Sequence, residues 1–281
     1  SHSLSRSIAD TLAVASPISK ASATRKLAAS VPSDIILPVR PPFVFSDLPA
    51  REDKPVLVPP AQVQRRSITA GKKGRFALLH ALAHIELNAI NLALDIALRF
   101  GCGNEDENNK GHALFPAQFT LEWLGVADDE AKHFLLLNDR LDALGGRYGD
   151  LPAHGGLWES AVATKDDPKA RLAVVPMVLE ARGLDVTPMI IEKFTAVKDF
   201  ESVAALEVIY EDEIGHVDVG RRWFEDLCKR DGLVYEDTWQ TLVKQYFKGV
   251  LKRPFNEAAR SEAGMEPPYY EPLADWYEGV T

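Results

Sequence analysis

Hydrophobic residues recur at helical spacing along most of the chain, whereas strict alternation of apolar and polar positions is scarce. The helical segments are bounded by ordinary start and stop signals, with Asp167-Pro168 opening one of them and Gly145-Gly146 closing another. The pattern therefore predicts an all-α fold with four long helices, at about residues 74–100, 117–145 and 199–230 and, for the third, from Asp167-Pro168 onward.

The third helix contains three residues that disturb helical structure. It carries Pro176, weakens at Gly183 and reaches Pro188, where we expect either a further turn or a kinked continuation. A fifth helix is expected after the fourth, with Asp237 as its N-cap and its end near Leu251. This extra C-terminal helix is followed by a Pro-rich, aromatic tail.

The N-terminal 33 residues are rich in Ser, Ala and basic residues, and Asp10 is their only acid. This composition faintly resembles an organelle transit segment. Apolar spacing favours a pair of short helices instead, one over residues 8–15 and a second that Pro17 opens and that runs to Ala28.

Eight prolines between residues 31 and 60 exclude a long helix or a central strand there. We interpret this stretch as an extended arm that packs through its apolar residues 35–37 and 43–45, with a disordered linker as the alternative. The expected organisation is residues 1–70 as a helical start and arm, and residues 71–281 as one helical bundle with a C-terminal extension.

The composition is that of an ordinary globular protein, with 46% hydrophobic and 26% charged residues among 281. A net charge of −9 gives the chain no general attraction to nucleic acid or anionic membranes. No uncharged apolar run reaches the length of a membrane span, so no membrane partner is expected. Two cysteines, Cys102 and Cys228, are too few for a disulfide framework and favour reduced thiols in a cytoplasmic protein.

Glutamate and histidine fall on the four long helices in a regular order. The first and third helices each carry one Glu on an apolar stripe, and the second and fourth each carry Glu-x-x-His. With 20 Glu and seven His, chance predicts about half an occurrence of Glu-x-x-His, whereas the chain has two. The six residues are Glu86, Glu130, His133, Glu180, Glu213 and His216.

Residues i and i+3 lie about 60° apart around a helix, so the two side chains of each Glu-x-x-His can reach one point. Four helices packed as a bundle would bring four carboxylates and two imidazoles together, the arrangement of ferritin-like di-iron and di-manganese proteins. Such ligands suit two iron ions, or manganese, and the set contains no thiolate that would favour copper(I). The alternative is a set of surface glutamates and two core histidines.

Three stretches extend this pattern: residues 80–86, 210–216 and 254–260. With them, the chain resembles the ferritin-like di-iron superfamily. Within that superfamily it resembles a bacterial and fungal family of unknown function that is similar to the tRNA hydroxylase acting on methylthio-isopentenyladenosine. The resemblance covers most of the chain and implies a ferritin-like four-helix bundle with the six residues as metal ligands. It does not settle a substrate.

These observations lead to an expected function, a non-haem di-iron enzyme of the hydroxylase or monooxygenase class. Its partners would be dioxygen, an external electron donor such as a reductase or ferredoxin, and a modified tRNA base or small organic molecule. We expect a monomer or dimer. The alternatives are a ferritin-type protein that oxidises or stores iron, which would form a large hollow oligomer, and a non-catalytic scaffold or RNA-binding module.

Other residues have a functional and a structural interpretation. Tyr210, one turn before Glu213, is either a catalytic neighbour of the metals or a core tyrosine. His80 and His84 are more consistent with hydrogen-bonded structural residues than with a second metal site. Arg260 either lines a pocket for an anionic substrate or holds the tail by ion pairing. Basic clusters could bind RNA if they met on one face, although surface charge balance is the simpler explanation. These clusters lie at residues 65–66, 72–75, 221–222, 229–230 and 252–253. Gly183 and Gly215 leave room that dioxygen or substrate could use.

Overall fold

Helices account for nearly all of the regular structure in the computed structural model. The predicted all-α class is confirmed for the residues that the structure describes. The chain divides into two compact units, Ser1–Trp158 and Glu159–Thr281. The ferritin-like bundle and the division at residues 70 and 71 stay predictions. The described residues are 3–34, 46–63, 67–68, 71–102 and 114–276.

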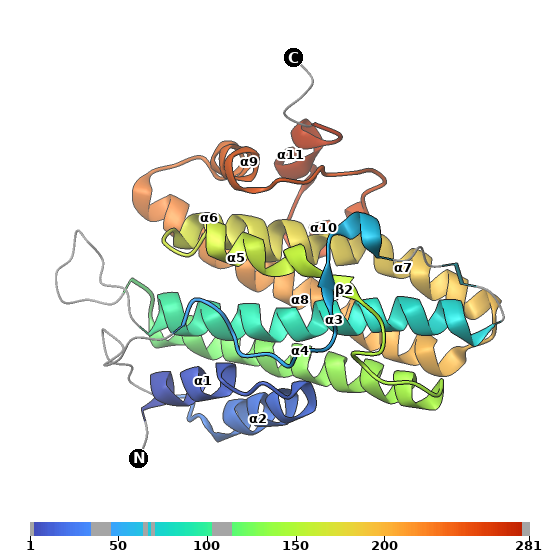
Figure 1. Ribbon diagram of the computed structural model, residues 1–281. Coiled ribbons are helices and arrows are strands. Elements are labelled where there is room, and N and C mark those ends of the chain that lie inside the picture. The colour runs from blue at the N-terminus through green and yellow to red at the C-terminus, as the bar shows by residue number, and fades with distance from the viewer. Residues whose placement is uncertain (1–2, 35–45, 64–66, 69–70, 103–113, 277–281) are drawn as a thin grey trace. The chain divides into compact units, whose positions relative to one another are not determined.

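The first unit is built on two long helices that run side by side, α3 and α4 (Figure 1). The π-helix η2 continues α3, the helix α2 packs against α4, and α1 contacts both α2 and α3. The bounds are α1 Leu4–Leu12, α2 Pro17–Ser30, α3 Lys72–Ile96, η2 Ala97–Gly101 and α4 Ala117–Ala143, with short 3-10 helices η1 at Pro60–Gln62 and η3 at Gly155–Trp158.

The predicted N-terminal pair of helices is confirmed, and the sequence explains where each begins. The Ser3 hydroxyl accepts a hydrogen bond from the Arg6 amide at the start of α1, and the Ser16 hydroxyl accepts one from the Ser19 amide at the start of α2. Pro17 occupies the first position of α2, where its missing N–H costs nothing.

Most apolar residues of α3 are buried, although Ile85 is exposed. By length and composition, Lys72–Gly101 is the one stretch in the described part of the chain that could cross a membrane. However, 72% of its most apolar segment of 18 residues is buried inside the protein. This burial is typical of a core helix.

Burial also raises the pKa of the thiols of Cys102 and Cys228 to about 11, and neither cysteine forms a disulfide within the described residues.

The described part of the Pro-rich arm packs onto the first unit. Strand β1 (Leu57–Val58) pairs in parallel with β2 (Ala153–His154). Upstream of β1, the Ala50 amide donates to the Leu12 carbonyl, and the Lys20 ammonium donates to the Ala50 carbonyl at 2.9 Å. The apolar residues at 35–37 and 43–45, through which the arm was expected to pack, lie outside the described residues.

Lys20 predicts a dependence of stability on pH. Its amine is buried and has neutral partners, Ala50 and the Asn91 side-chain oxygen at 2.8 Å, and burial lowers its pKa from 10.5 to about 8. Between these pKa values the unfolded chain keeps a proton that the folded chain releases. The free energy of unfolding should therefore rise by about 1.4 kcal/mol per pH unit in that window. Urea unfolding at several pH values measures the free energy of unfolding of wild type and of Lys20→Met. The difference between the two proteins should change across this pH window, and the same pH dependence in both would contradict the prediction.

The second unit centres on α8, which contacts α6, η4, α7 and α9 (Figure 1). The Asp167 and Asp199 side chains cap α6 and α8, and Gly232 ends α8 in the left-handed conformation at φ 67°. The bounds are α5 Glu159–Ala163, α6 Pro168–Val174, the π-helix η4 Val175–Glu180, α7 Ala181–Ala196, α8 Phe200–Asp231, α9 Tyr235–Tyr246, α10 Glu257–Glu262, α11 Pro267–Tyr270 and the 3-10 helix η5 Glu271–Leu273.

Several predicted helix bounds were wrong, and one alternative for the third helix is confirmed. The first helix lies at Leu4–Leu12 instead of residues 8–15. The third helix does not weaken at Gly183, and α7 passes through Pro188 as a continuation, one of the two expected outcomes. The fifth helix, α9, begins after Val234 instead of at Asp237 and ends at Tyr246. It cannot reach Leu251, because the backbone there bridges to Ala274 and the Leu251 carbonyl accepts a hydrogen bond from the Asp275 amide.

Candidate metal centre

The first unit brings together three of the six predicted ligands, which we call triad 1: Glu86, Glu130 and His133. Glu86 lies on α3, and the other two lie on α4 at i and i+3. His133 Nδ1 is 3.1 Å from Glu130 Oε2 and 3.3 Å from Glu86 Oε2, within hydrogen-bonding distance of both. All three side chains are buried. The packing of α3 along α4 therefore creates a buried group of two carboxylates and one imidazole.

The electrostatics of triad 1 favour a bound cation. Burial raises the pKa of Glu86 well above its usual range, the Glu130 carboxylate raises it further, and hydrogen bonding to His133 partly opposes both effects. Two carboxylates held this close in a buried place are unstable as a pair of anions. A divalent cation between them would offset the repulsion and keep both ionised.

The second unit brings together the other three, which we call triad 2: Glu180, Glu213 and His216. Glu213 and His216 are buried on α8, and the half-buried Glu180 is the last residue of η4. His216 Nδ1 lies 3.7 Å from Glu213 Oε2. In each triad the three side chains offer ligand atoms within 4.8 Å of one another.

A π-helical segment positions Glu180, and sequence reasoning missed it. Val175–Glu180 forms π-helix where the prediction was an α-helix disturbed by Pro176. Pro176 explains the change, because it has no N–H to donate to the α-helical ladder. Such π segments are rare and concentrate at functional sites. The only signal in the sequence is a proline four residues before an apolar-stripe glutamate.

Close packing against α8 supports this π-helix. A Cβ added at Gly220 would lie 2.2 Å from Cγ of Pro176, so only glycine fits there. Gly220→Ala is expected to lower the free energy of unfolding by about 1–3 kcal/mol, through overpacking that displaces η4. Urea denaturation measures the stability, and metal titration should show weaker binding at triad 2.

Gly215→Ala provides the matched control on the same helix. Gly215 is exposed, and a Cβ there meets no atom within 4 Å. Helix propensity alone should make this variant up to about 1 kcal/mol more stable. Equal stability of the two variants would show that the contact between Gly220 and Pro176 does not constrain η4.

Tyr210 lies one turn before Glu213 on α8 and is half-buried. Its hydroxyl oxygen accepts a hydrogen bond of 2.9 Å from Asn256 Nδ2, which also donates to the Leu184 carbonyl. Asn256 belongs to the 254–260 stretch singled out in the sequence. The structure therefore ties Tyr210 to the C-terminal segment, and a catalytic role for it stays a prediction.

His80 and His84 are hydrogen-bonded within the first unit, as the structural interpretation predicts. His84 Nε2 lies 3.1 Å from the His154 carbonyl, and its Nδ1 lies 2.7 Å from the Tyr148 hydroxyl. Burial lowers the pKa of His84 to about 4, so it is neutral near pH 7. His80 Nε2 accepts hydrogen bonds from the amides of Gly149 and Leu151.

Several arginines of the second unit contact acids. Arg221 pairs with Asp218 and Glu225, and Arg230 pairs with Asp226. These contacts are what surface charge balance predicts, and Arg65 and Arg66 lie outside the described residues.

Arg260 holds the tail by ion pairing. Its Nε and Nη2 donate to both oxygens of the Asp185 carboxylate at 2.9 and 2.7 Å, and both residues are buried. Asp185 was not predicted to matter, and its pairing partner lies 75 residues away in the chain.

Comparisons with known proteins place the chain among relatives without an assigned activity. A family model described as "Protein of unknown function (DUF455)" matches residues 13–271. A Haemophilus influenzae protein named "Uncharacterized protein" is 46% identical over 219 residues, which is 78% of this chain and 74% of that protein. No solved structure matches the chain.

Proposed function

The chain belongs to the family described as a protein of unknown function (DUF455), and we propose that it binds two iron or manganese ions and activates dioxygen to oxidise an organic substrate. One observation carries the proposal. Each unit holds two carboxylates and one imidazole whose ligand atoms lie within 4.8 Å of one another. The proposal assigns one metal ion to each triad.

The chemistry of the donors fits these metals. Carboxylate oxygen and neutral imidazole nitrogen are ligands that iron and manganese accept readily. Each triad carries two negative charges when its carboxylates are ionised, which matches one divalent cation. In triad 1, the contact between His133 and the carboxylates fixes the imidazole ring, and α3 and α4 hold the three side chains in place without a loop.

Iron held by the two triads would supply the redox chemistry for reducing dioxygen. Hydroxylation of a C–H bond would consume two electrons and two protons from an external donor, with one oxygen atom of dioxygen entering the substrate and the other leaving as water. The residues of the chain hold the metals, keep their charge balanced and exclude bulk water from triad 1. The substrate in this proposal is a modified tRNA base or a small organic molecule.

The test is dioxygen consumption by the reduced protein. Protein loaded with ferrous ion under anaerobic conditions and then exposed to air should consume dioxygen in proportion to its iron. Glu180→Ala should lower this consumption at least tenfold, because ligand loss lowers metal affinity by that much or more. Glu192→Ala is the matched control, since Glu192 is an exposed glutamate of α7.

Two outcomes would overturn the proposal. An iron-loaded protein that consumes no dioxygen would exclude an oxygen-activating function. Uptake of many iron ions per chain by a large hollow oligomer would favour iron storage of the ferritin type. Measuring the particle mass together with the iron-to-chain ratio separates storage from catalysis.

A further inference from the structure

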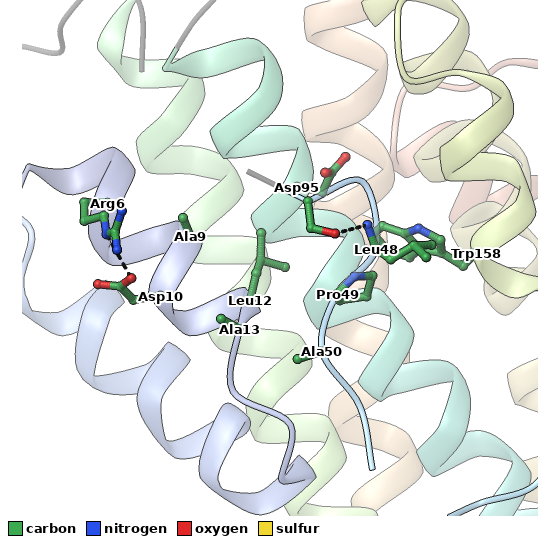
Figure 2. A pocket seen from close by; sticks show the side chains of 11 residues that line it. Arg6, Ala9, Asp10, Leu12, Ala13, Leu48, Pro49, Ala50, Asp95 and Trp158 are labelled. Atoms are coloured by element: carbon green, nitrogen blue, oxygen red, sulfur yellow. Dashed lines mark hydrogen bonds and ion pairs between the residues drawn. The ribbon is translucent and has the colours of Figure 1, made fainter. Parts of the chain in front are cut away.

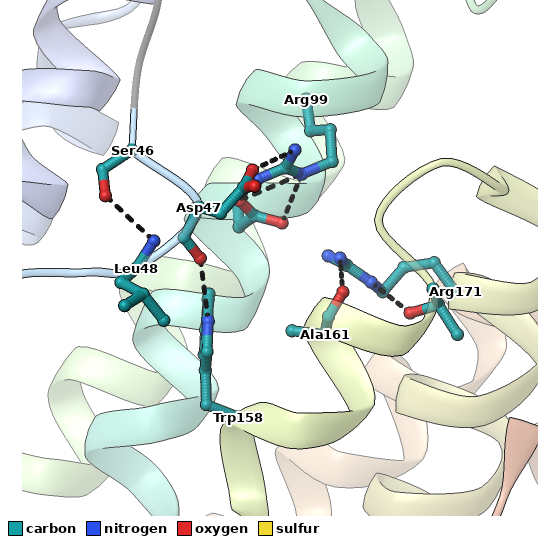
Figure 3. A network of polar contacts seen from close by, with 9 residues as sticks. Ser46, Asp47, Leu48, Arg99, Trp158, Ala161 and Arg171 are labelled. Carbon is teal, nitrogen blue, oxygen red and sulfur yellow. Dashed lines mark hydrogen bonds and ion pairs between the residues drawn. The ribbon is translucent and has the colours of Figure 1, made fainter.

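Two cavities of the first unit, both apart from triad 1, differ in how their polar groups are bonded. The cavity beside Trp158 has a volume of about 400 Å³ and is lined by α1 and by arm residues 46–50 (Figure 2). Arg6 pairs with Asp10 there at 3.1 Å, and the indole N–H of Trp158 donates to the Asp47 carbonyl at 2.9 Å (Figure 3). These polar groups already bond to one another, so they indicate no particular ligand.

The other cavity has a volume of about 510 Å³ and a mostly polar lining. It lies between the start of α2, the arm residue Glu52, the C-terminal half of α4 and the turn that follows α4. Only three of its nine lining residues are apolar, namely Pro17, Ile18 and Phe134. Small-molecule pockets are usually lined mainly by apolar side chains, so this lining suits a polar ligand with a small apolar part.

Asn138 of α4 lines this cavity with a side-chain amide that forms no hydrogen bond to any described residue. The residue is only 8% exposed, and it shares one face of α4 with Phe134 and Asp142, one turn before it and one turn after it. A buried amide without a partner is destabilising, and such groups are rare in folded proteins. A ligand that offers both a donor and an acceptor would satisfy it, because the amide has both.

Charged side chains of both signs line the cavity as well. Glu52, Asp142 and Arg147 are exposed, and the side chain of each forms no ion pair or hydrogen bond within the described part of the chain. A carboxylate can bind an ammonium group, and a guanidinium can bind a carboxylate through two parallel hydrogen bonds. A ligand that carries both charges could therefore use both kinds of group, whatever the net charge of the cavity.

The start of α2 adds a further preference for an anionic group. Ser16 is the N-cap of this helix of 14 residues, and Pro17 and Ile18 follow it along the cavity. The N-terminus of a helix carries a partial positive charge, which stabilises an anion placed near it. Together with Arg147, it favours the carboxylate of a ligand.

Two aromatic residues of the lining are held in place. The Tyr148 hydroxyl donates to His84 Nδ1 at 2.7 Å, and the centre of its ring lies 5.4 Å from that of Phe134. A wall that is fixed before binding loses little conformational freedom when a ligand enters.

We propose that this cavity binds a small zwitterion, a free amino acid with an apolar side chain. The carboxylate of the ligand would bind Arg147, and its ammonium group would bind Glu52 or Asp142. The Asn138 amide would hydrogen-bond to the charged groups of the ligand, and the apolar side chain would contact the apolar residues of the lining. The site shares no residue with either triad and does not depend on the proposed metal chemistry.

The test compares L-leucine with the two molecules that each lack one of its charged groups, 3-methylbutylamine and 4-methylpentanoate. Binding is followed in the full chain by the side-chain amide signals of Asn138 in proton–nitrogen correlation spectra, and their loss in Asn138→Leu assigns them. L-Leucine should shift these signals saturably. Its affinity should be at least about tenfold higher than that of either analogue, because each analogue lacks one charge-assisted contact.

The variant Asn138→Leu separates ligand binding from a structural role of the amide. It should weaken binding of L-leucine at least about tenfold in calorimetric titration. Its urea midpoint should equal or exceed that of wild type, because the amide has no partner to lose among the described residues. A lower midpoint would show that the amide serves the fold instead, and would contradict the proposal.

Charge variants test which group of the ligand each side chain binds. Arg147→Gln should weaken binding of L-leucine and 4-methylpentanoate but not of 3-methylbutylamine, and Glu52→Gln/Asp142→Asn should show the opposite selectivity. Asp139→Asn removes an exposed carboxylate of α4 outside the cavity, and it should bind as wild type does. The absence of a saturable shift with L-leucine, equal or tighter binding of either analogue, or unchanged binding in Asn138→Leu would each overturn the proposal.

Discussion

Replacing His133 with alanine is expected to remove at least one of the two metal ions that we propose the chain binds. The imidazole contacts both carboxylates of triad 1, so its loss takes away one ligand and leaves Glu86 and Glu130 less well held. Affinity at triad 1 should fall by more than about 100-fold, beyond the effect of losing an outer contact of a ligand. Metal analysis after dialysis, together with titration of ferrous or manganous ion, measures the change.

The same exchange at triad 2 gives an independent test. His216→Ala should lower the metal content in the same way, and the double variant His133→Ala/His216→Ala should bind no metal tightly. Glu207→Gln, an exposed glutamate of α8, and Asp139→Asn on α4 are the matched controls. If both histidine variants kept the full metal content of wild type, the triads would not be the binding sites.

Arg260→Ala is expected to lower the free energy of unfolding by about 3 kcal/mol, because it leaves the buried Asp185 carboxylate with only the longer 3.5 Å contact to Arg182 and the Asn256 amide. The Asp185 side chain is fully buried, and Arg260 also lies 4.6 Å from the Tyr270 ring centre and 4.9 Å from that of Phe255. The variant therefore loses packing as well as charge. Urea denaturation at neutral pH measures the effect.

Two further variants identify the cause. Asp185→Leu/Arg260→Leu removes both charges and should recover most of the lost stability, as apolar replacements of buried ion pairs often do. Arg253→Ala breaks an exposed pair with Glu271 and should cost less than about 1 kcal/mol. A small effect of Arg260→Ala, similar to that of Arg253→Ala, would show that the buried pair does not anchor the tail.

Local sequence signals predicted much of the helical structure. Pro17, Asp167-Pro168 and Gly145-Gly146 mark helix ends close to where the structure has them, because caps act through neighbouring backbone groups. Glu-x-x-His spacing likewise places Glu130 and His133 on one face of α4. Signals of this kind need no knowledge of distant contacts.

Features that depend on distant contacts could not be predicted. The backbone bridge between Leu251 and Ala274 keeps Leu251 out of α9, and the role of Asp185 depends on Arg260. The π-helix before Glu180 requires both a proline and the space that Gly220 leaves on a different helix.

The metal content of the wild-type chain tests the central claim most directly. Protein reconstituted anaerobically with ferrous or manganous ion, then freed of loosely bound metal, is analysed by elemental mass spectrometry and amino-acid quantification. The account predicts two ions per chain, one for each triad. A chain that retains neither metal under these conditions would contradict it.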